Sequence, residues 1–465
     1  MTADAAAVAR AHAGAVAATD KHPKGLYVLF ATEMWERFSF YSMLAMFALY
    51  MRDTTGQGFA WSVDDTQALV ANYLMFVYLS PLVGGWIADR KLGYRKSVMI
   101  GGLFFMAGHL LLSFHSLGVV YAALTCLVIG NGFFKPNVSA MVGNLYPEGS
   151  RLKDRAYSIF YMGINVGACS APIVMEIVQR NFGYHPAFAV AAGGMLLSVL
   201  ILWRLKRHVE MADRPGHQGA SETADTAAVA VDAPPASVSH QNAIDAVPDW
   251  KRVGALIVVF LIVIVFWMVF HQNSTTITYW GNENTDWKLS GIISNSINPG
   301  WVIILTFPLV WFWGWLDKKG LEPSTPTKMV FGMVMTAAAF FIFFIAAKIG
   351  EASAPAGGNP YALGAYKMSP LWMLGAYGVL TLGELMLSPM GLSLVSKVAP
   401  VRMRGLLMGG WFFATAMGNK LTQIGQLWDD WLHSTFWIFL SACALVMAFV
   451  LLILLRPLKK AMPGV

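Results

Sequence analysis

Twelve apolar runs, each long enough to cross a lipid bilayer as a helix, constrain this chain more than any other feature. A bilayer core about 30 Å thick needs roughly 20 apolar residues per helix. Charged residues make up only 13% of the 465 residues, against roughly 25% in an average soluble domain, so we expect an all-α integral membrane protein. The predicted transmembrane helices are 26–51, 66–88, 96–115, 118–143, 156–179, 184–205, 253–279, 290–316, 327–349, 370–398, 404–428 and 435–455.

A polar stretch between the sixth and seventh runs divides the chain into two halves. It is rich in Ala, Asp, Ser, Pro and His and has no apolar run of span length, which is typical of a flexible linker. We therefore expect five regions: a disordered cytoplasmic N-terminus over 1–25, an N-terminal six-helix bundle over 26–205, a flexible cytoplasmic linker over 206–250, a C-terminal six-helix bundle over 251–457 and a cytoplasmic tail over 458–465.

The basic residues predict how the spans are oriented. Most of the 33 Lys and Arg residues fall on the side that holds both termini and the linker. The loops on the other side hold only Arg52, Arg180, Lys288, Lys348 and Lys367. Positively charged loops stay in the cytoplasm, so we expect both termini to be cytoplasmic. The net charge of +7 then reflects membrane topology, and we expect no nucleic-acid partner.

Three ionisable residues interrupt the first apolar run. Glu33, Glu36 and Arg37 are spaced i, i+3 and i+4, which places them on one face of a helix. Each charge at the centre of a membrane costs about 2.5–3.5 kcal/mol, so this face must meet water or partners, and such a cluster is a functional-site hypothesis. The alternative is a purely structural ion pair.

Polar residues in other spans fall at a similar depth. With about 1.5 Å of rise per residue, Lys135, Asn165 and Glu384 all lie near the midplane. Secondary transporters bind substrate at this depth, between their two halves. Each residue also has a simpler interpretation: Lys135 could reach towards a helix end, Glu384 could be a hydrogen-bonded core acid, and Asn165 and Asn298 could join neighbouring helices.

A short loop motif recurs once in each half. Residues 85–93 (GWIADRKLG) follow the second span, and residues 314–320 (GWLDKKG) follow the eighth. A tight turn with cytoplasmic positive charge is the simpler explanation for either loop alone. Together with the six-plus-six arrangement, the repeat resembles the major facilitator superfamily of secondary transporters, whose halves are related by a repeat.

The first span resembles a motif of the proton-dependent oligopeptide transporter family. That motif is Glu-x-x-Glu-Arg followed by aromatic residues, here Glu33, Glu36 and Arg37 followed by Phe38, Phe40 and Tyr41. Further stretches that resemble the same family are 84–89 (GGWIAD), 133–139 (FFKPNVS), 158–167 (SIFYMGINVG) and 383–389 (GELMLSP).

This resemblance implies a proton-coupled symporter that imports di- and tripeptides by alternating access. It implies that Arg37 and Lys135 lie near the peptide carboxylate, and that Glu384, Asn165 and Asn298 lie near its amino end. The aromatic walls of the cavity would be Tyr41, Tyr78, Trp267 and Trp411.

The same cluster offers a route for proton coupling. A carboxylate held between a base and a second acid can change its protonation over the working pH range. We hypothesise that protonation of Glu33 or Glu36 releases Arg37 or Lys135 to bind substrate, and that Glu384 shares in the coupling.

The chain departs from the family pattern at two positions. Many members carry an Arg where this chain has Leu44, and an acidic residue where this chain has His271. His271 is expected about 27 Å from the cytoplasmic entry, near the outer surface. It is a candidate outer proton sensor, and an ordinary hydrogen-bonded histidine is the alternative.

Other classes of function have little support in the sequence. No nucleotide-binding loop and no His-Glu-x-x-His metal motif is present, and we expect no enzymatic activity, catalytic residue, cofactor or bound metal. Transport of another solute on the same fold, such as nitrate or a peptide-like drug or metabolite, stays open. We expect a monomer in the bacterial cytoplasmic (inner) membrane, with peptides, protons and the lipid bilayer as its partners.

Overall fold

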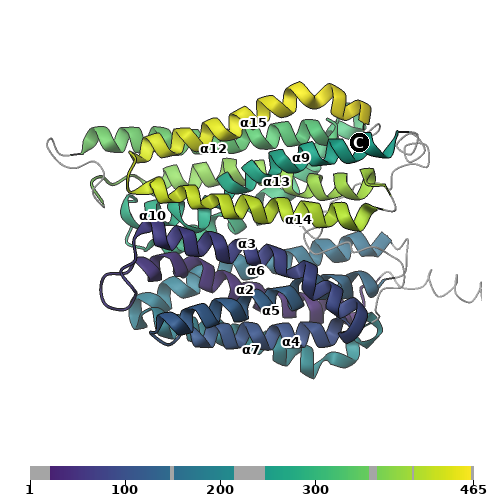
Figure 1. Cartoon of the computed structure of the whole chain (residues 1–465), viewed down its shortest axis with the longest axis horizontal. Helices are drawn as coiled ribbons and strands as arrows, with labels where there is room; N and C mark the ends of the chain where they lie inside the picture. Colours follow the sequence, from purple (N-terminus) through teal and green to yellow (C-terminus); the bar gives the residue numbers. More distant parts are fainter. Residues whose placement is uncertain (1–20, 147–150, 214–246, 355–363, 401–402, 462–465) are drawn as a thin grey trace, which may run out of the picture.

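The computed structural model describes residues 21–146, 151–213, 247–354, 364–400 and 403–461. Most of the predicted N-terminal region, most of the linker and the last four residues of the tail lie outside these ranges. The described residues fold into two helical bundles that lie side by side, the first coloured purple to teal and the second teal to yellow (Figure 1).

The N-terminal bundle contains six long helices that run nearly parallel to one another. They are α2 (Lys24–Arg52), α3 (Val63–Ile87), α4 (Tyr94–Leu111), α5 (Leu117–Asn144), α6 (Arg151–Phe182) and α7 (Tyr184–Arg204). A single π-helical turn, η1 (Ala88–Leu92), extends α3.

The C-terminal bundle begins with a helix that is broken in two. Its helices are α9 (Asp249–Phe270), α10 (Thr276–Glu283), α11 (Ile297–Lys318), α12 (Thr325–Ser353), α13 (Pro370–Val398), α14 (Arg404–Leu421) and α15 (His433–Ala461). We call the end of the molecule with Lys24, Arg204, Asp249 and Ala461 the linker end, and the end with Arg52 and Glu283 the far end.

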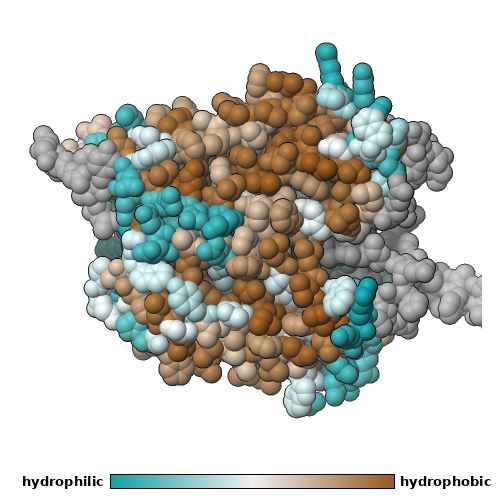
Figure 2. Space-filling model, viewed as in Figure 1, coloured by the Kyte–Doolittle hydropathy of each residue, from teal (hydrophilic) through white to brown (hydrophobic). Residues whose placement is uncertain are grey.

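The described helices confirm the predicted all-α membrane fold. Among the residues that the structure describes, nine helical segments are long and apolar enough to cross a membrane by length and composition. The other three long helices are α2, α4 and α14, and each carries charged residues within its length. On the face shown in Figure 2, apolar side chains cover most of the middle, and polar ones gather mainly towards the two ends.

Glycines allow the helices of the N-terminal bundle to pack closely. A Cβ atom at Gly84 of α3 would lie 1.9 Å from the carbonyl oxygen of Gly132 in α5. At Gly167 of α6 it would lie 2.3 Å from the carbonyl oxygen of Met34 in α2. Small residues at such contacts are typical of helix association in membranes, where close packing replaces the hydrophobic effect.

Three predicted spans are not continuous α-helices. The predicted span 253–279 breaks at the 3₁₀ turn η5 (His271–Ser274), and the span 290–316 begins with the 3₁₀ turn η6 (Gly291–Ser296). The span 404–428 ends in a third such turn, η8 (Thr422–Trp428). Irregular backbone at membrane depth is tolerated where it is buried in protein or lines a cavity.

The first residues of the predicted linker are folded against the N-terminal bundle. Two 3₁₀ turns cover Lys206–His208 and Glu210–Ala212, and Ala212 is fully buried. The backbone N–H of Arg95 donates to Asp213 Oδ1 at 2.9 Å. The prediction of a flexible chain from residue 206 was therefore wrong for residues 206–213, because these side chains find partners on the bundle.

Candidate functional site

A polar cavity lies between the two bundles. Its volume is about 150 Å³, counted as the space open to the centre of a water molecule. Residues from both halves line it: Glu33, Arg37, Phe40, Tyr41, Leu44, Leu74, Val77, Tyr78, Asn131, Lys135, Tyr161, Ile164, Asn165, Ala168, Trp267, Phe270, His271, Asn273, Ser274, Asn295, Asn298, Pro299, Glu384 and Ser388.

The acid–base cluster of α2 forms one wall of the cavity. The Arg37 side chain is buried, and its Nη2 donates to Glu36 Oε1 at 2.7 Å while its Nε also contacts Glu36 Oε2. Arg37 Nε lies 3.2 Å from Glu33 Oε1. Glu33 and Arg37 line the cavity, whereas Glu36 is fully buried behind them. Two carboxylates therefore hold one guanidinium, and neutralising either acid would loosen it.

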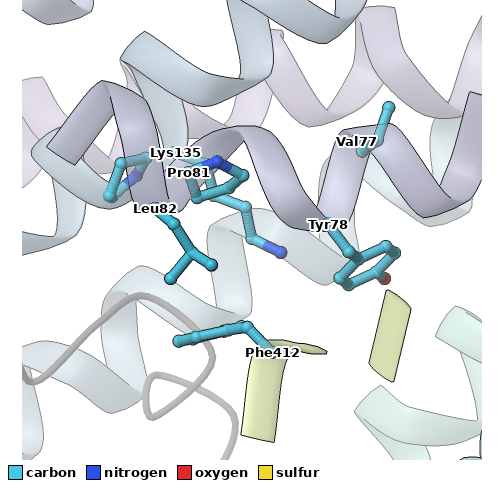
Figure 3. A pocket seen from close by; sticks show the side chains of 7 residues that line it. Val77, Tyr78, Pro81, Leu82, Lys135 and Phe412 are labelled. Atoms are coloured by element: carbon cyan, nitrogen blue, oxygen red, sulfur yellow. The ribbon is translucent and has the colours of Figure 1, made fainter. Parts of the chain in front are cut away.

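Lys135 supplies a second cation from the same half. Its Nζ lies 5.1 Å from the centre of the Tyr78 ring, a distance that permits a cation–π interaction. Figure 3 shows Lys135 and Tyr78 on the N-terminal half, with Phe412 of α14 across from them. Arg37 and Lys135 thus give this half two positive groups facing the cavity.

The C-terminal half contributes an acid. Asn298 Nδ2 donates to Glu384 Oε2 at 2.9 Å and to Thr381 Oγ1 at 3.0 Å. This links the start of α11 to α13 and fixes one oxygen of the carboxylate. The cavity therefore has two cations on one wall and a positioned acid on the other.

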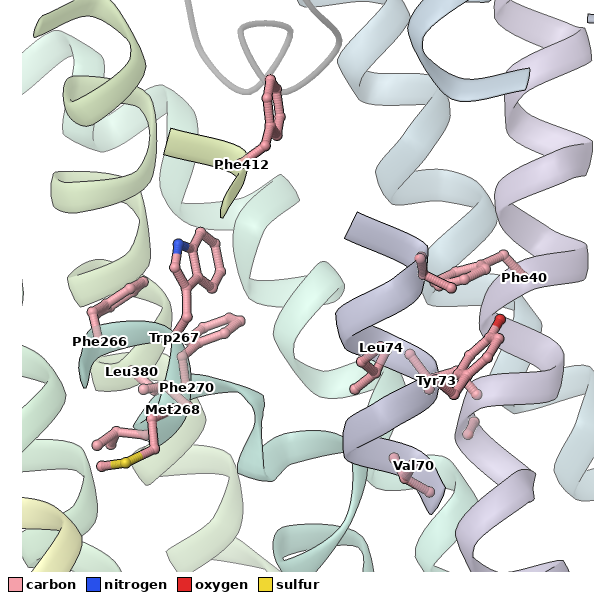
Figure 4. Close-up of a cluster of buried hydrophobic side chains, with 14 of the residues drawn as sticks. Phe40, Val70, Tyr73, Leu74, Phe266, Trp267, Met268, Phe270, Leu380 and Phe412 are labelled. Atoms are coloured by element: carbon pink, nitrogen blue, oxygen red, sulfur yellow. The ribbon is translucent and has the colours of Figure 1, made fainter. Parts of the chain in front are cut away.

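Aromatic rings line the cavity from both halves, with Tyr41 and Tyr78 on one and Trp267 and Phe270 on the other. Figure 4 shows Trp267 and Phe270 on one side of the interface and Tyr73 and Leu74 on the other. The His271 ring stacks on Trp267 with centroids 4.9 Å apart, and it lies 5.9 Å from the Tyr78 ring. The predicted position of His271 near the outer surface was wrong, because α9 ends at Phe270 and η5 directs His271 into the cavity.

The structure brings most of the predicted site residues together. The residues that line the cavity as predicted are Glu33, Arg37, Tyr41, Tyr78, Lys135, Asn165, Trp267, Asn298 and Glu384. Trp411 lies elsewhere: it is 1% exposed and packs against Phe260, with the backbone of Gly391 pressed close to its ring. This placement corrects the prediction that Trp411 is a cavity wall.

Sequence reasoning missed a set of amide and hydroxyl side chains in the cavity. Asn273, Ser274 and Asn295 line it from η5 and η6, and Asn131 lines it from α5. Asn131 Nδ2 donates to the carbonyl oxygen of Val77, which ties α5 to α3. The sequence does carry a signal for these residues, since 271–274 (HQNS) and 294–300 (SNSINPG) are polar interruptions of apolar spans.

The far end of the interface is closed by a charged contact between the halves. The Arg52 guanidinium of α2 lies 3.1 Å from Glu283 Oε1 and 3.4 Å from Asp429 Oδ2, both in the other half. It also lies 4.4 Å from the centre of the Tyr279 ring. This contact joins the two halves at the far end of α2.

Two further polar contacts join the halves, one between α14 and α3 and one between Ser290 and α6. Lys420 Nζ of α14 donates to Asn72 Oδ1 of α3 at 2.6 Å. Ser290 donates to the Glu176 carboxylate of α6 through its backbone N–H, at 2.8 Å, and through its hydroxyl. Within η8, a Cβ atom at Gly425 would lie 2.5 Å from Gln67 Nε2, so the absence of a side chain lets α3 approach.

Two six-helix bundles around a polar midplane cavity define a secondary transporter. The profile of the Major Facilitator Superfamily matches residues 29–419. The sequence is 32% identical to the peptide transporter YePEPT of Yersinia enterocolitica, over 95% of each chain. It is 30% identical to the di-/tripeptide transporter of Lactococcus lactis subsp. lactis, over 95% of this chain and 97% of that one.

A solved structure of the peptide transporter POT in complex with sulfate has the same fold. It matches with a TM-score of 0.81 and 28% identity, over 95% of this chain and 96% of that one. The chain belongs to the major facilitator superfamily and, within it, to the proton-dependent oligopeptide transporter family. The family predicted from its motifs is therefore confirmed.

Proposed function

We propose that the protein is a proton-coupled symporter that imports di- and tripeptides by alternating access. The observation that carries this proposal is the division of charge in the cavity, with Arg37 and Lys135 on one half and Glu384 on the other. A zwitterion entering a site of low dielectric needs a partner for each end. The names of the relatives, which are peptide and di-/tripeptide transporters, support the same substrate class.

The two ends of a peptide would meet opposite walls. The carboxylate would bind Arg37 and Lys135, and the ammonium group would bind Glu384 together with Asn298 and the side chain of Asn165. Because Asn298 already orients Glu384, the acid needs little rearrangement to accept an ammonium group. Binding both ends at once would draw the two halves together.

Proton coupling would act through the α2 cluster. Arg37 is held by both Glu33 and Glu36, so it is not free to bind a carboxylate fully until one acid takes a proton. Lys135 and Glu384 would complete the coupled set. His271 would add a titratable group in the cavity rather than at the surface, stacked on Trp267.

The proposal includes a membrane orientation. The linker end would face the cytoplasm of a bacterium and the far end the outside of its inner membrane, with the protein acting as a monomer and without enzymatic activity. In this orientation the contacts of Arg52 would close the outer entrance. The undescribed part of the linker, 214–246, would tether the halves.

Uptake by proteoliposomes tests the substrate. An imposed inward proton gradient should drive accumulation of labelled dialanine, and unlabelled tripeptide should compete. Competition by nitrate instead of tripeptide, or no dependence on the proton gradient, would contradict the proposal.

A double substitution tests the coupling. Glu33→Gln with Glu36→Gln should abolish proton-driven uptake but leave peptide counterflow measurable. Glu322→Gln is the matched control, because Glu322 pairs with Lys328 in a loop at the linker end, away from the cavity. Uptake against a gradient in the double variant would refute the assigned role of the two acids.

A further inference from the structure

We propose that the linker end carries two equivalent sites for an anionic phospholipid, one formed by Trp86 and Arg90 and the other by Trp315 and Lys319. This inference rests on the membrane fold and is independent of the proposed peptide substrate.

The repeated loop motif builds the same contact in both halves. At the end of α3, the Arg90 guanidinium carbon lies 4.8 Å from the centre of the Trp86 ring. At the end of α11, Lys319 Nζ lies 3.8 Å from the centre of the Trp315 ring. In each case the cation follows the tryptophan by four residues, so one turn of helix brings it over the ring. Each copy of the repeat therefore has a tryptophan ring with a cation over it.

Both pairs are open to a ligand. Trp86 is 51% exposed and Trp315 is 41% exposed, and both cations are exposed. Among the residues that the structure describes, neither Arg90 nor Lys319 has a carboxylate within 4.0 Å. Their N–H groups are therefore available for the charge-assisted hydrogen bonds that phosphate accepts.

The local charge favours an anion over a zwitterion. In the first loop Asp89 is outnumbered by Arg90 and Lys91, and in the second Asp317 is outnumbered by Lys318 and Lys319. A zwitterionic headgroup would bring its own cation against these residues. An anionic headgroup such as phosphatidylglycerol brings only the phosphate.

Apolar side chains next to each pair suit acyl chains. On α3, Val83 is 61% exposed. On α11, Trp311 is 71% exposed and Phe312 is 40% exposed. Apolar surface of this kind forms the band across the middle of Figure 2. Phosphate and apolar contacts together select a lipid rather than a free anion.

The two tryptophan–cation pairs lie at the ends of their helices, where a phospholipid headgroup is expected. The two candidate spans end at Leu92 and Lys318, so each tryptophan lies within the last two turns of its span and each cation lies at its end. Tryptophan and basic residues favour this boundary between headgroups and hydrocarbon. A phospholipid placed there meets both parts of the site at once.

Lipid retention by the purified full-length protein tests the proposal. Native mass spectrometry would count bound phosphatidylglycerol, and thermal unfolding would report stabilisation by the same lipid. The variant Arg90→Gln with Lys319→Gln should bind phosphatidylglycerol about fivefold more weakly at each site, since one basic residue near the lipid surface contributes about this factor.

The chain supplies a matched control for charge. Lys91→Gln with Lys318→Gln removes the same charge from the same two loops but leaves both ring contacts intact. This control should retain phosphatidylglycerol more strongly than the Arg90/Lys319 variant. Equal loss in the two variants would show a general charge effect and overturn the proposed sites.

Two further comparisons keep the test decisive. Trp86→Phe with Trp315→Phe preserves an aromatic ring and both charges, so it should lower retention less than removal of the cations does. Equal stabilisation of the wild-type protein by phosphatidylcholine, or by inorganic phosphate alone, would also overturn the proposal. If the Arg90/Lys319 variant does not fold, loss of retention in Trp86→Ala with Trp315→Ala supports the sites, and full retention refutes them.

Discussion

Arg52 should control whether the far end of the transporter is closed. Its side chain is only 13% exposed, and it contacts Glu283, which is 12% exposed, and Asp429, which is 50% exposed. Arg52→Ala would remove both ion pairs and the contact with the Tyr279 ring. It would leave Glu283 as a nearly buried charge without this partner.

The expected effect follows from that burial. Truncating one partner of a buried, hydrogen-bonded charge pair costs about 2–5 kcal/mol, and the exposed Asp429 contact adds little. We take the lower part of this range, about 2–3 kcal/mol, because Arg52 and Glu283 keep some solvent contact. The ratio of far-end-closed to far-end-open molecules should then fall by about 30- to 150-fold.

Distances between spin labels measure this ratio. Labels at Thr54, in the exposed loop after α2, and at Ala352, exposed near the far end of α12, report the separation of the two halves. The native Cys126, Cys169 and Cys443 must first be replaced. Arg52→Ala should shift the distance distribution towards longer values in lipid nanodiscs.

Two variants separate the buried charge from other effects. Arg180→Ala also removes a contact between the halves, a 2.6 Å hydrogen bond to the carbonyl oxygen of Lys288, but Arg180 is 53% exposed. It should therefore cost at most about 1 kcal/mol. Adding Glu283→Gln to Arg52→Ala should restore part of the closed population. An unchanged distribution in Arg52→Ala, or one equal to that of Arg180→Ala, would refute the reasoning.

Three more substitutions give specific outcomes. Gly425→Ala should disfavour the closed far end, because its Cβ would lie 2.5 Å from buried Gln67. The control Gly409→Ala should leave the label distances unchanged, because its Cβ would lie 3.8 Å from its nearest neighbour. Burial raises the pKa of Asp429 in the closed form. The closed form should therefore gain population as the pH falls towards that pKa and lose it as the pH rises. Asp429→Asn should flatten this dependence of the label distances on pH. Gly84→Ala should lower the thermal unfolding midpoint, because its Cβ would lie 1.9 Å from a backbone carbonyl oxygen of α5, and an unchanged midpoint would contradict this packing.

The acid–base cluster could be predicted from the sequence because it depends on one helix. The spacing of Glu33, Glu36 and Arg37 fixes their common face, and a membrane leaves such charges no alternative to partners. The structure adds which partner each finds, with Glu36 buried behind Arg37 and Glu33 at the cavity. Lys135 and Glu384 were also found from depth alone, since helical rise sets depth in a spanning helix.

The errors share a physical cause. His271 was misplaced and the polar residues after it were missed because the sequence was interpreted as one continuous helix, whereas the chain unwinds at η5 and again at η6. Trp411 was assigned to the cavity because an aromatic residue at helical spacing has the same pattern whether it faces a cavity or the core. Its burial depends on Phe260 and Gly391, which are distant in the sequence.

The sequence by itself determined the membrane class, the two-bundle fold and the family, because bilayer thickness dictates the length of each apolar run and the motifs lie within single helices. Only the tertiary structure decided how the halves meet. Arg52 reaches Glu283 across 231 positions of sequence, and Lys420 reaches Asn72 across 348. These contacts depend on the relative placement of two bundles, which no local pattern specifies.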